Sequence, residues 1–490
     1  MSIRLLHLSD IHLGGGFCHG KTNPATGLNT RFEDFVRTLT LCIDRALGLE
    51  PWPKPWAAAA QPVDLVLFGG DAFPDATPPP LVQDAFAQQF RRLAEAGIPT
   101  VMLVGNHDQY AQGQGGSSLS LYRTLGIPGI VVGDRLQTHA IHTRGGPVQV
   151  ITVPWLSRST LLTREDTEGL SLSALHERLL DRLRVALEGE IRQLRPDVPT
   201  ILLGHLMVDT ARFGAERFLA MGKGLTIPLT LLHRDCFDYV ALGHVHRHQV
   251  LATHPPVVYP GSIERVDFSE EKEEKGVVLA DIGGDQTVVQ FWPLPGRSFC
   301  TVRVDLAAIA QTTANDPLQL EPQGSQSSNK LQHPLQQHLQ HPLQQHLQQH
   351  LQQQLMAAIA TAPIDDAVLR VIYRVSPDQL DAIDLSQLTE ILSRAHTYTI
   401  QPELTQQRVR PRLPDLAMGT MTDPIEALTT YLKHHPELAE WGEDMIATAH
   451  ALQTQLEVSD RSDDRLYSSD MNVDNAAPVV AETVDQLRLL

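Results

Sequence analysis

Side chains of the types that bind metal ions occur in five short motifs along the first half of the chain. Each motif directly follows a run of apolar residues. The motifs are Asp10-Ile11-His12, Gly70-Asp71, Gly105-Asn106-His107-Asp108, Gly204-His205 and Gly243-His244-Val245-His246. Residues i and i+2 of an extended chain point the same way, so both polar members of a D-x-H or H-x-H pair can face one ion. A glycine beside a ligand lets the backbone turn sharply where a strand ends.

Carboxylate and imidazole together form a ligand set that suits Mn²⁺, Fe²⁺ or Zn²⁺ better than Ca²⁺ or Mg²⁺. The set is too large for one tetrahedral ion, but it suits two ions about 3.5–4 Å apart that share a carboxylate. Two such ions lower the pKa of a shared water and clamp phosphate oxygens, so that the resulting hydroxide can attack phosphorus in line. Each motif alone is more simply a turn or a strand end. Their occurrence together, in order, predicts a two-metal phosphoesterase.

Alternating strands and helices over residues 1–295 must position these motifs. Apolar runs predict strands over 3–8, 63–68, 99–104, 148–153, 200–203, 237–242, 257–259, 276–282 and 288–292. Helical spacing of apolar residues predicts helices over 31–49, 81–96 and 175–194. Since strand after strand ends at a polar motif, this α/β unit is expected to place its ligands at the carboxyl ends of its strands.

The order D-x-H, GD, GNHD, GH, GHxH resembles the calcineurin-like metallophosphoesterase superfamily. Three stretches resemble the SbcD-type nucleases more narrowly, namely residues 3–14, residues 243–247, and residues 259–270 with the following Glu274-Lys275-Gly276. The resemblance covers residues 1–295 well and the rest loosely. It implies an α/β fold, a four-layer metallophosphoesterase β-sandwich flanked by helices, with a small α+β capping domain and C-terminal helices.

The resemblance also implies a role for each site residue. One ion would be held by Asp10, His12, Asp71 and His246, and the other by Asp71, Asn106, His205 and His244. Asp71 would bridge two divalent ions, for which Mn²⁺ is the first expectation. His107 would not bind metal but would stabilise the transition state or protonate the leaving oxygen, and Asp108 would orient His107.

The implied activity is that of a metal-dependent DNA exonuclease, with or without endonuclease activity, in DNA repair, recombination and replication. Its partners would be DNA, an SbcC-like coiled-coil ATPase and a second copy of the chain, as a homodimer within a heterotetramer. Apolar residues at helical intervals within 423–456 fit a helix that docks on the ATPase; the alternative is a helix that packs on its own chain. They are Ile425, Leu428, Tyr431, Leu432 and Leu438.

Four parts are expected along the chain. They are a nuclease domain over 1–295, a capping domain over 296–415, a helical partner-binding segment over 422–457 and a disordered acidic tail over 458–490. Within the capping domain, the pattern predicts strands over 300–304 and 368–375 and a helix over 385–395.

A Gln/His/Leu-rich insertion occupies about 310–356 of the capping domain. Leucine recurs at every fourth position from Leu331 to Leu355, and Pro334 and Pro342 are expected to break a helix in its first half, leaving one that ends near Ile359. The favoured interpretation is a tandem-repeat expansion ahead of a real helix. Partner binding stays open, as does metal binding by His333, His338, His341, His346 and His350.

Composition sets the remaining bounds. The 490 residues are 42% hydrophobic, and the apolar run at the N-terminus is broken by Arg4 and His7, so we expect neither a signal peptide nor a membrane helix, and a cytoplasmic location. Four scattered cysteines favour neither a zinc ribbon nor disulfides. The net charge of −18 argues against nucleic acid as a partner unless local patches or another protein supply the basic surface.

Two other functions stay open. One is a phosphoesterase of another substrate class, such as a protein phosphatase or cyclic-nucleotide phosphodiesterase, and the other is a non-catalytic scaffold.

Overall fold

The computed structural model describes residues 2–52, 61–110, 116–156, 171–212, 225–284, 286–315, 335–405, 425, 428–429, 432 and 442–450. The chain divides into two units, residues 1–405 and residues 406–490. In the second unit, the described residues are helical. The predicted acidic tail over 458–490 lies outside the described residues, as do residues 316–334 of the insertion. Among the described helices, none is long and apolar enough to cross a membrane.

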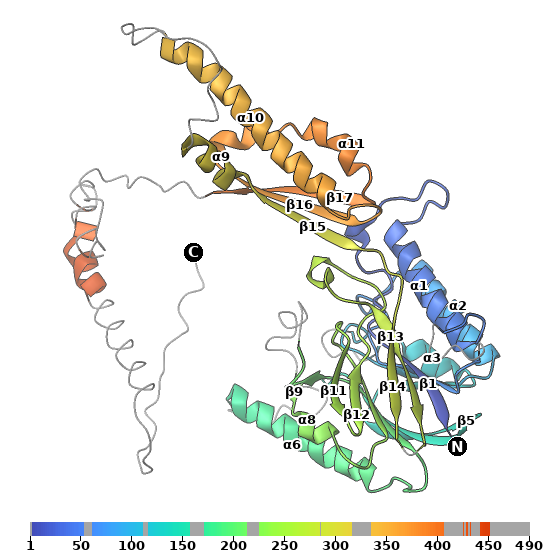
Figure 1. Ribbon diagram of the computed structural model, residues 1–490. Coiled ribbons are helices and arrows are strands. Elements are labelled where there is room, and N and C mark those ends of the chain that lie inside the picture. The colour runs from blue at the N-terminus through green and yellow to red at the C-terminus, as the bar shows by residue number, and fades with distance from the viewer. Residues whose placement is uncertain are drawn as a thin grey trace. The chain divides into compact units, whose positions relative to one another are not determined.

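Two six-stranded sheets form the centre of the first unit (Figure 1). The first sheet has the order β14-β13-β1-β2-β3-β4, with β1 (Ile3–Leu8), β2 (Leu65–Phe68), β3 (Thr100–Leu103), β4 (Ile130–Gly133), β13 (Gly276–Ile282) and β14 (Val288–Pro293). The second has the order β11-β12-β10-β7-β6-β5, with β5 (Gln137–Thr143), β6 (Gly146–Val153), β7 (Thr200–His205), β10 (Tyr239–Gly243), β11 (Gln249–Thr253) and β12 (Pro256–Tyr259).

Alternation along the strands explains why the sheets stack. Ile3 and Leu5 of β1 belong to the core between the sheets, whereas Leu6 and Leu8 belong to the core beneath the helices α1 (Thr30–Ala46) and α2 (Pro80–Glu95). On the far side, α6 (Leu172–Ile191) covers the second sheet with its own apolar stripe. Helix, sheet, sheet and helix make four layers, so the predicted sandwich is confirmed.

Local signals set the limits of the two helices on the first sheet. The side chain of Asn29 caps α1 by accepting a hydrogen bond from the Arg31 backbone N–H, and α2 begins with Pro80 at its first position, where the missing N–H costs nothing. Shorter elements link the layers. They are α3 (Ser120–Leu125), α8 (Leu229–Leu232), β8 (Met207–Val208), β9 (Thr226–Ile227), η1 (Phe17–His19) and η3 (Phe268–Glu270).

A separate three-stranded parallel sheet follows, made of β15 (Phe299–Asp305), β16 (Val368–Val375) and β17 (Thr397–Leu404). Helices α9 (Leu306–Asn315) and α10 (Leu335–Thr361) accompany it, and Leu351, Leu355 and Ile359 of α10 are buried in the same core as this sheet. The sheet occupies the region predicted for a capping domain, whose boundaries stay a prediction.

Two predictions for this region are wrong. Helix α10 runs through Pro342 instead of starting after it. Proline removes only one backbone hydrogen bond there, while the buried leucines further along hold the helix in place. The helix predicted over 385–395 is a 3₁₀ turn, η6 (Leu385–Leu388), followed by one α-turn, α11 (Thr389–Leu392), after the 3₁₀ segment η5 (Pro377–Ala382). No α-helix continues to residue 395, because Arg394 and Ala395 donate to the carbonyls three residues back, those of Ile391 and Leu392, instead of four.

Candidate metal centre

All five polar motifs meet at one edge of the two sheets. Strands β1, β2 and β3 run parallel in the first sheet, and β7 and β10 run parallel in the second. Each motif lies at the carboxyl end of one of these strands. Backbone bonds tie the first two motifs together, from the Asp10 N–H to Gly70 O at 3.0 Å and from the His12 N–H to Asp71 O at 3.0 Å. The nine predicted site residues therefore share one region.

The backbone is strained at four of the predicted ligands. Asp10, His12, Asp71 and His244 have φ angles of 52°, 44°, 57° and 98°, in the left-handed region that non-glycine residues seldom adopt. Among the other described residues that are not glycine, only Asp366 has a positive φ angle. Strain of this kind costs roughly 1–3 kcal/mol per residue and gathers at functional sites.

Asp71 lies between two groups of possible ligands, one near His12 and one near His205, and it also forms a group able to hold an ion with His12 and His107. Its Oδ2 is 3.7 Å from His12 Nε2 and 3.3 Å from His205 Nε2, while its Oδ1 accepts a hydrogen bond from the His107 N–H at 2.8 Å. Gly105 permits this arrangement, because a Cβ there would lie 2.1 Å from Asp71 Oδ1. A carboxylate so placed can contact an ion on each side.

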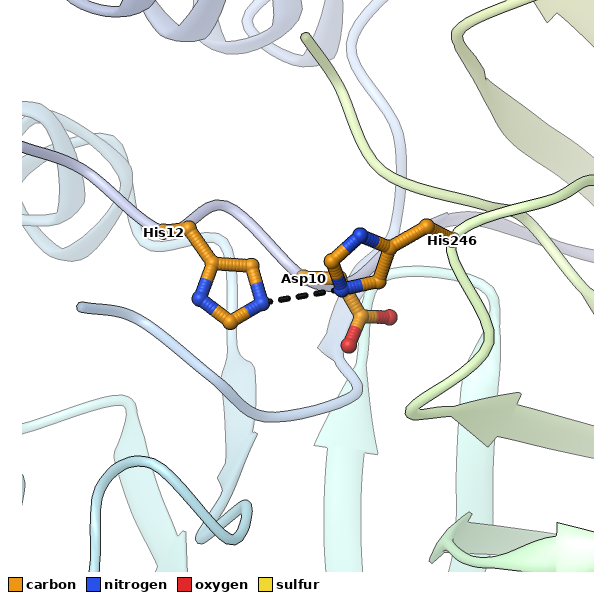
Figure 2. A group of neighbouring side chains, drawn as sticks. All are labelled: Asp10, His12 and His246. Carbon is orange, nitrogen blue, oxygen red and sulfur yellow. Dashed lines mark hydrogen bonds between the residues drawn. The ribbon is translucent and has the colours of Figure 1, made fainter. Parts of the chain in front are cut away.

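The first group is formed by Asp10, His12 and His246, whose ligand atoms lie within 4.8 Å of one another (Figure 2). The two Nε2 atoms of His12 and His246 are 3.0 Å apart. His246 Nδ1 donates to Glu270 Oε1 at 2.7 Å, so a lone pair remains on its Nε2. That lone pair points at His12, where either a shared proton or a cation must separate the two nitrogens.

The second group is formed by Asp71, His205 and His244, with Asn106 between them. His205 Nδ1 donates to the Gly69 carbonyl at 2.7 Å, which leaves its Nε2 facing Asn106 Oδ1 at 3.0 Å and Asp71 Oδ2 at 3.3 Å. Asn106 Oδ1 also lies 2.9 Å from His244 Nδ1. Oxygen and nitrogen lone pairs thus converge on one point, as they do around a cation.

Burial and neighbouring charged groups shift the pKa values of the histidines in this centre. Burial disfavours a charged His205, but the adjoining Asp71 outweighs it and raises the pKa of His205 to about 9. A proton then occupies the place that a cation would take. Burial and the neighbouring His246 lower the pKa of His12 to about 3, and burial with His205 lowers that of His244. These two imidazoles are therefore neutral, which is the form that binds metal.

One expected contact is corrected by the structure. Asp108 does not orient the ring of His107. Its carboxylate instead accepts hydrogen bonds from the backbone N–H groups of Asp71, Ala72 and Gly105 and from the Ser118 hydroxyl. The His107 ring donates from Nδ1 to the Pro74 carbonyl at 2.7 Å. Four donors thus surround the buried carboxylate of Asp108, three of them backbone N–H groups next to the predicted ligands.

Sequence reasoning missed the partner of His246. Glu270 lies within the stretch 259–270 that carried the narrower resemblance, but nothing in its spacing gave it a role. The repeat histidines show no such assembly: within the described part of the chain, the groups able to hold an ion all lie at the strand-end motifs. Of those histidines, four lie on α10, namely His338, His341, His346 and His350, and His346 is exposed.

Comparison with known proteins identifies relatives of this chain. A DNA double-strand break repair protein Mre11 from Aeropyrum pernix is 24% identical over 62% of this chain and 64% of its own length. The SbcD component of nuclease SbcCD is 27% identical in Bacillus subtilis, over 57% of this chain and 66% of its own, and 26% identical in Escherichia coli K12, over 56% and 64%. Each alignment thus spans less than two thirds of the relative. The model of the calcineurin-like phosphoesterase family matches residues 3–248, half of the chain. The chain belongs to the calcineurin-like phosphoesterase family.

Proposed function

We propose that this chain is the nuclease subunit of an SbcCD-like DNA repair and recombination complex and acts as a metal-dependent DNA exonuclease. The observation that carries the proposal is the position of Asp71 between two groups of inward-facing nitrogen and oxygen ligands. The relatives in the comparison are named as nucleases or as a double-strand break repair protein, which favours DNA over other phosphoesters.

In this proposal Asp10, His12 and His246 would hold one divalent ion, Asn106, His205 and His244 a second, and Asp71 would join both. Mn²⁺ is the proposed metal because the ligands mix imidazole with carboxylate. When bound, two such ions supply an activated water and neutralise charge on the phosphate. The neutral His12 and His244 rings and the fixed Nδ1–H of His205 keep the ligand lone pairs directed into the centre.

His107 has the exposure and the orientation to act on substrate. It is only partly buried, and its Nδ1 is engaged by the Pro74 carbonyl, so Nε2 remains for a substrate oxygen. A protonated ring there would donate to the leaving oxygen or stabilise the charge that develops on phosphate. Asp108 would contribute by fixing the backbone at Asp71 and Gly105.

The assembly is part of the same proposal. The helical segment within 422–457 would dock on an SbcC-like coiled-coil ATPase, and two copies of the chain would form a homodimer within a heterotetramer. The bacterial relatives are named as one component of the nuclease SbcCD, which supports a complex of several chains. A partner that grips DNA would also explain how a chain of net charge −18 acts on a polyanion.

The first prediction concerns His107→Leu. End-labelled linear duplex DNA with Mn²⁺ is compared with a phosphopeptide and a cyclic nucleotide, each at equal protein concentration. We expect wild type to degrade DNA in preference to both. His107→Leu should lower the rate by roughly 10²- to 10⁴-fold, the usual contribution of general acid catalysis. It should still bind Mn²⁺ in calorimetry, since leucine removes no proposed ligand.

His142→Leu is the matched control, because His142 is an exposed histidine on β5 outside the strand-end motifs. This variant should cleave DNA at the wild-type rate. Normal cleavage by His107→Leu would refute the role given to His107. Preferential hydrolysis of the phosphopeptide or the cyclic nucleotide by wild type would refute the nuclease itself.

A further inference from the structure

The short segment 268–271 touches both the candidate metal centre and the three-stranded sheet. It contains η3 (Phe268–Glu270) and Glu271, between β12 and β13. Its two adjacent glutamates have different partners. Glu270 is bonded within the phosphoesterase layers and Glu271 is bonded to the sheet that follows them.

On the inner side, Glu270 fixes the ring of His246. The Oε1 atom of Glu270 accepts from His246 Nδ1 at 2.7 Å, and its Oε2 accepts from Lys275 Nζ at 2.9 Å and from the Val266 N–H at 3.0 Å. Glu270 is only 5% exposed. The orientation of His246 Nε2, which faces His12, therefore depends on where the Glu270 carboxylate is held.

On the outer side, the sheet holds the same segment through several contacts. Thr301 of β15 donates to Glu271 twice, from its N–H at 3.0 Å and from its hydroxyl at 2.6 Å. The guanidinium of Arg370 on β16 lies over the Phe268 ring, 4.1 Å from its centroid, and donates to Thr301 Oγ1 at 3.2 Å. The Phe268 ring also meets Phe299 of β15 edge to face, with centroids 5.0 Å apart.

From these contacts we propose that Glu271 is a positioning residue that makes metal binding at His246 depend on the seating of the three-stranded sheet. Consecutive Cα atoms are about 3.8 Å apart, so the backbone at Glu271 cannot move far without displacing Glu270. Release of Thr301 would free Glu271, loosen Glu270 and leave His246 without a fixed orientation. Any partner that shifts the sheet would then change ion affinity, and bound ions would change the affinity for that partner equally. The inference rests on the proposed function for the assignment of His246 as a ligand.

A purely structural role makes a different forecast. Lys275 and Val266 also bond Glu270, and they could hold it in place whatever Glu271 does. Removal of Glu271 would then lower thermal stability without lowering ion affinity. The two cases separate in a double-mutant cycle, because a residue that acts through Glu270 has no effect once Glu270 is gone.

The experiment is a calorimetric titration of the full chain with Mn²⁺, without DNA. Loss of a partner that orients a ligand costs about 10- to 100-fold in metal affinity, and we expect this range for Glu270→Ala. Glu271 acts on His246 only through Glu270, so Glu271→Ala should lower Mn²⁺ affinity less, by about 3- to 10-fold. The double variant should bind as Glu270→Ala alone. A wild-type affinity in Glu271→Ala, or a loss that adds in full to that of Glu270→Ala, would overturn the proposal.

Three further variants guard against a general loss of structure. Glu271→Gln keeps an amide oxygen for the Thr301 N–H and should bind Mn²⁺ nearly as wild type. Thr301→Val removes only the hydroxyl donor and should share part of the Glu271→Ala loss. Glu403→Ala removes an exposed glutamate of β17, 3.4 Å from Arg303, and should change nothing. If wild type binds Mn²⁺ with this pattern but degrades no DNA, the proposed function fails while the positioning role stands.

Discussion

Two buried polar clusters in this molecule have opposite characters. One is the candidate metal centre at the ends of β1, β2, β3, β7 and β10. The other lies along α1, where the fully buried Arg31 donates to Asp34 at 2.7 Å and to Glu264 at 2.9 Å. Both concentrate carboxylates and nitrogen groups away from water. They differ in whether the groups within each cluster satisfy one another.

In the arginine cluster every carboxylate faces a donor. Asp34 also accepts from Arg297 through Nε at 2.6 Å and Nη2 at 2.8 Å, and Glu264 accepts from the Thr38 hydroxyl and from the Arg297 N–H. Each negative oxygen in this cluster therefore has a donor, and the one buried atom of Arg31 without a hydrogen-bond partner is a donor, its Nε. Arg31, Asp34 and Thr38 of this cluster lie on the regular helix α1.

In the metal centre, only a proton or a cation can reconcile the facing atoms. Nε2 of His205 faces two oxygens, and Nε2 of His246 faces Nε2 of His12. The backbone at four ligands is strained as well. Burial of charge thus does not mark a site by itself. A site is marked where lone pairs converge without enough donors, because such an arrangement persists only if it serves a ligand.

The largest effect is expected from Asp71→Asn, because Asp71 is the residue proposed to contact both ions. The amide removes the bridging charge, so both ions should bind weakly, and cleavage should fall by about 10³-fold or more, the equivalent of several kcal/mol of lost transition-state stabilisation. The ion-free variant should remain folded, because the new N–H₂ group supplies a donor where Asp71 Oδ2 faced His205 and His12. DNA cleavage, Mn²⁺ calorimetry and thermal unfolding measure the three effects.

A variant with intact Mn²⁺ affinity would show that Asp71 does not bridge the ions. A variant that no longer folds would place Asp71 in the same class as Arg31 and remove the distinction between the two clusters. Asp366→Asn is the matched control, since Asp366 has a positive φ angle of 54° but lies outside the strand-end motifs. Its cleavage rate should equal that of wild type.

The second effect tests the arginine cluster. Arg31→Met should cost about 3–5 kcal/mol of unfolding free energy, because it leaves Asp34 and Glu264 buried with too few donors. The folded protein should still bind Mn²⁺ as wild type does, since the cluster holds no proposed ligand. Urea denaturation gives the first quantity and calorimetry in the absence of urea gives the second.

Arg37 provides the control, because it pairs with the same Asp34 at 2.8 Å but is 60% exposed. Arg37→Met should cost no more than about 1 kcal/mol, as exposed ion pairs usually do. Equal losses from the two arginines would mean that burial does not distinguish them. A Mn²⁺ affinity lowered by Arg31→Met would mean that the two clusters are not independent.

The sequence predicted the metal centre better than the arginine cluster for a physical reason. Ligands such as Asp10 and His12 follow apolar strands, and similar residues follow other strands. The local pattern and the order of the strands are therefore enough to predict that these residues lie together. Arg31 fits the polar face of a predicted helix equally well whether it is exposed or buried. Its partner Glu264 is more than 200 residues away, and only tertiary packing brings the two together.

The local sequence pattern also could not predict features that depend on backbone atoms or on packing between distant parts of the chain. Pro74 contacts His107 through its carbonyl, an atom that every residue has. Strand β17, with the sequence TYTIQPEL, is largely exposed and was not predicted, because it forms by pairing with β16. Helix α10 crosses Pro342 because burial of Leu351 and Leu355 outweighs the local preference of proline.

The smallest effect concerns the ions themselves. If facing lone pairs mark a metal site, Mn²⁺ should bind the folded protein and stabilise it by about 2.7 kcal/mol at a hundredfold excess over the dissociation constant. Arg37→Met should gain as much as wild type, and Asp71→Asn almost nothing. Thermal unfolding with Mn²⁺, and again after chelation, measures the gain. Stabilisation that survives Asp71→Asn would place binding elsewhere in the chain, as the histidines within residues 331–355 would allow, and would end the contrast between a cluster that needs an ion and one that does not.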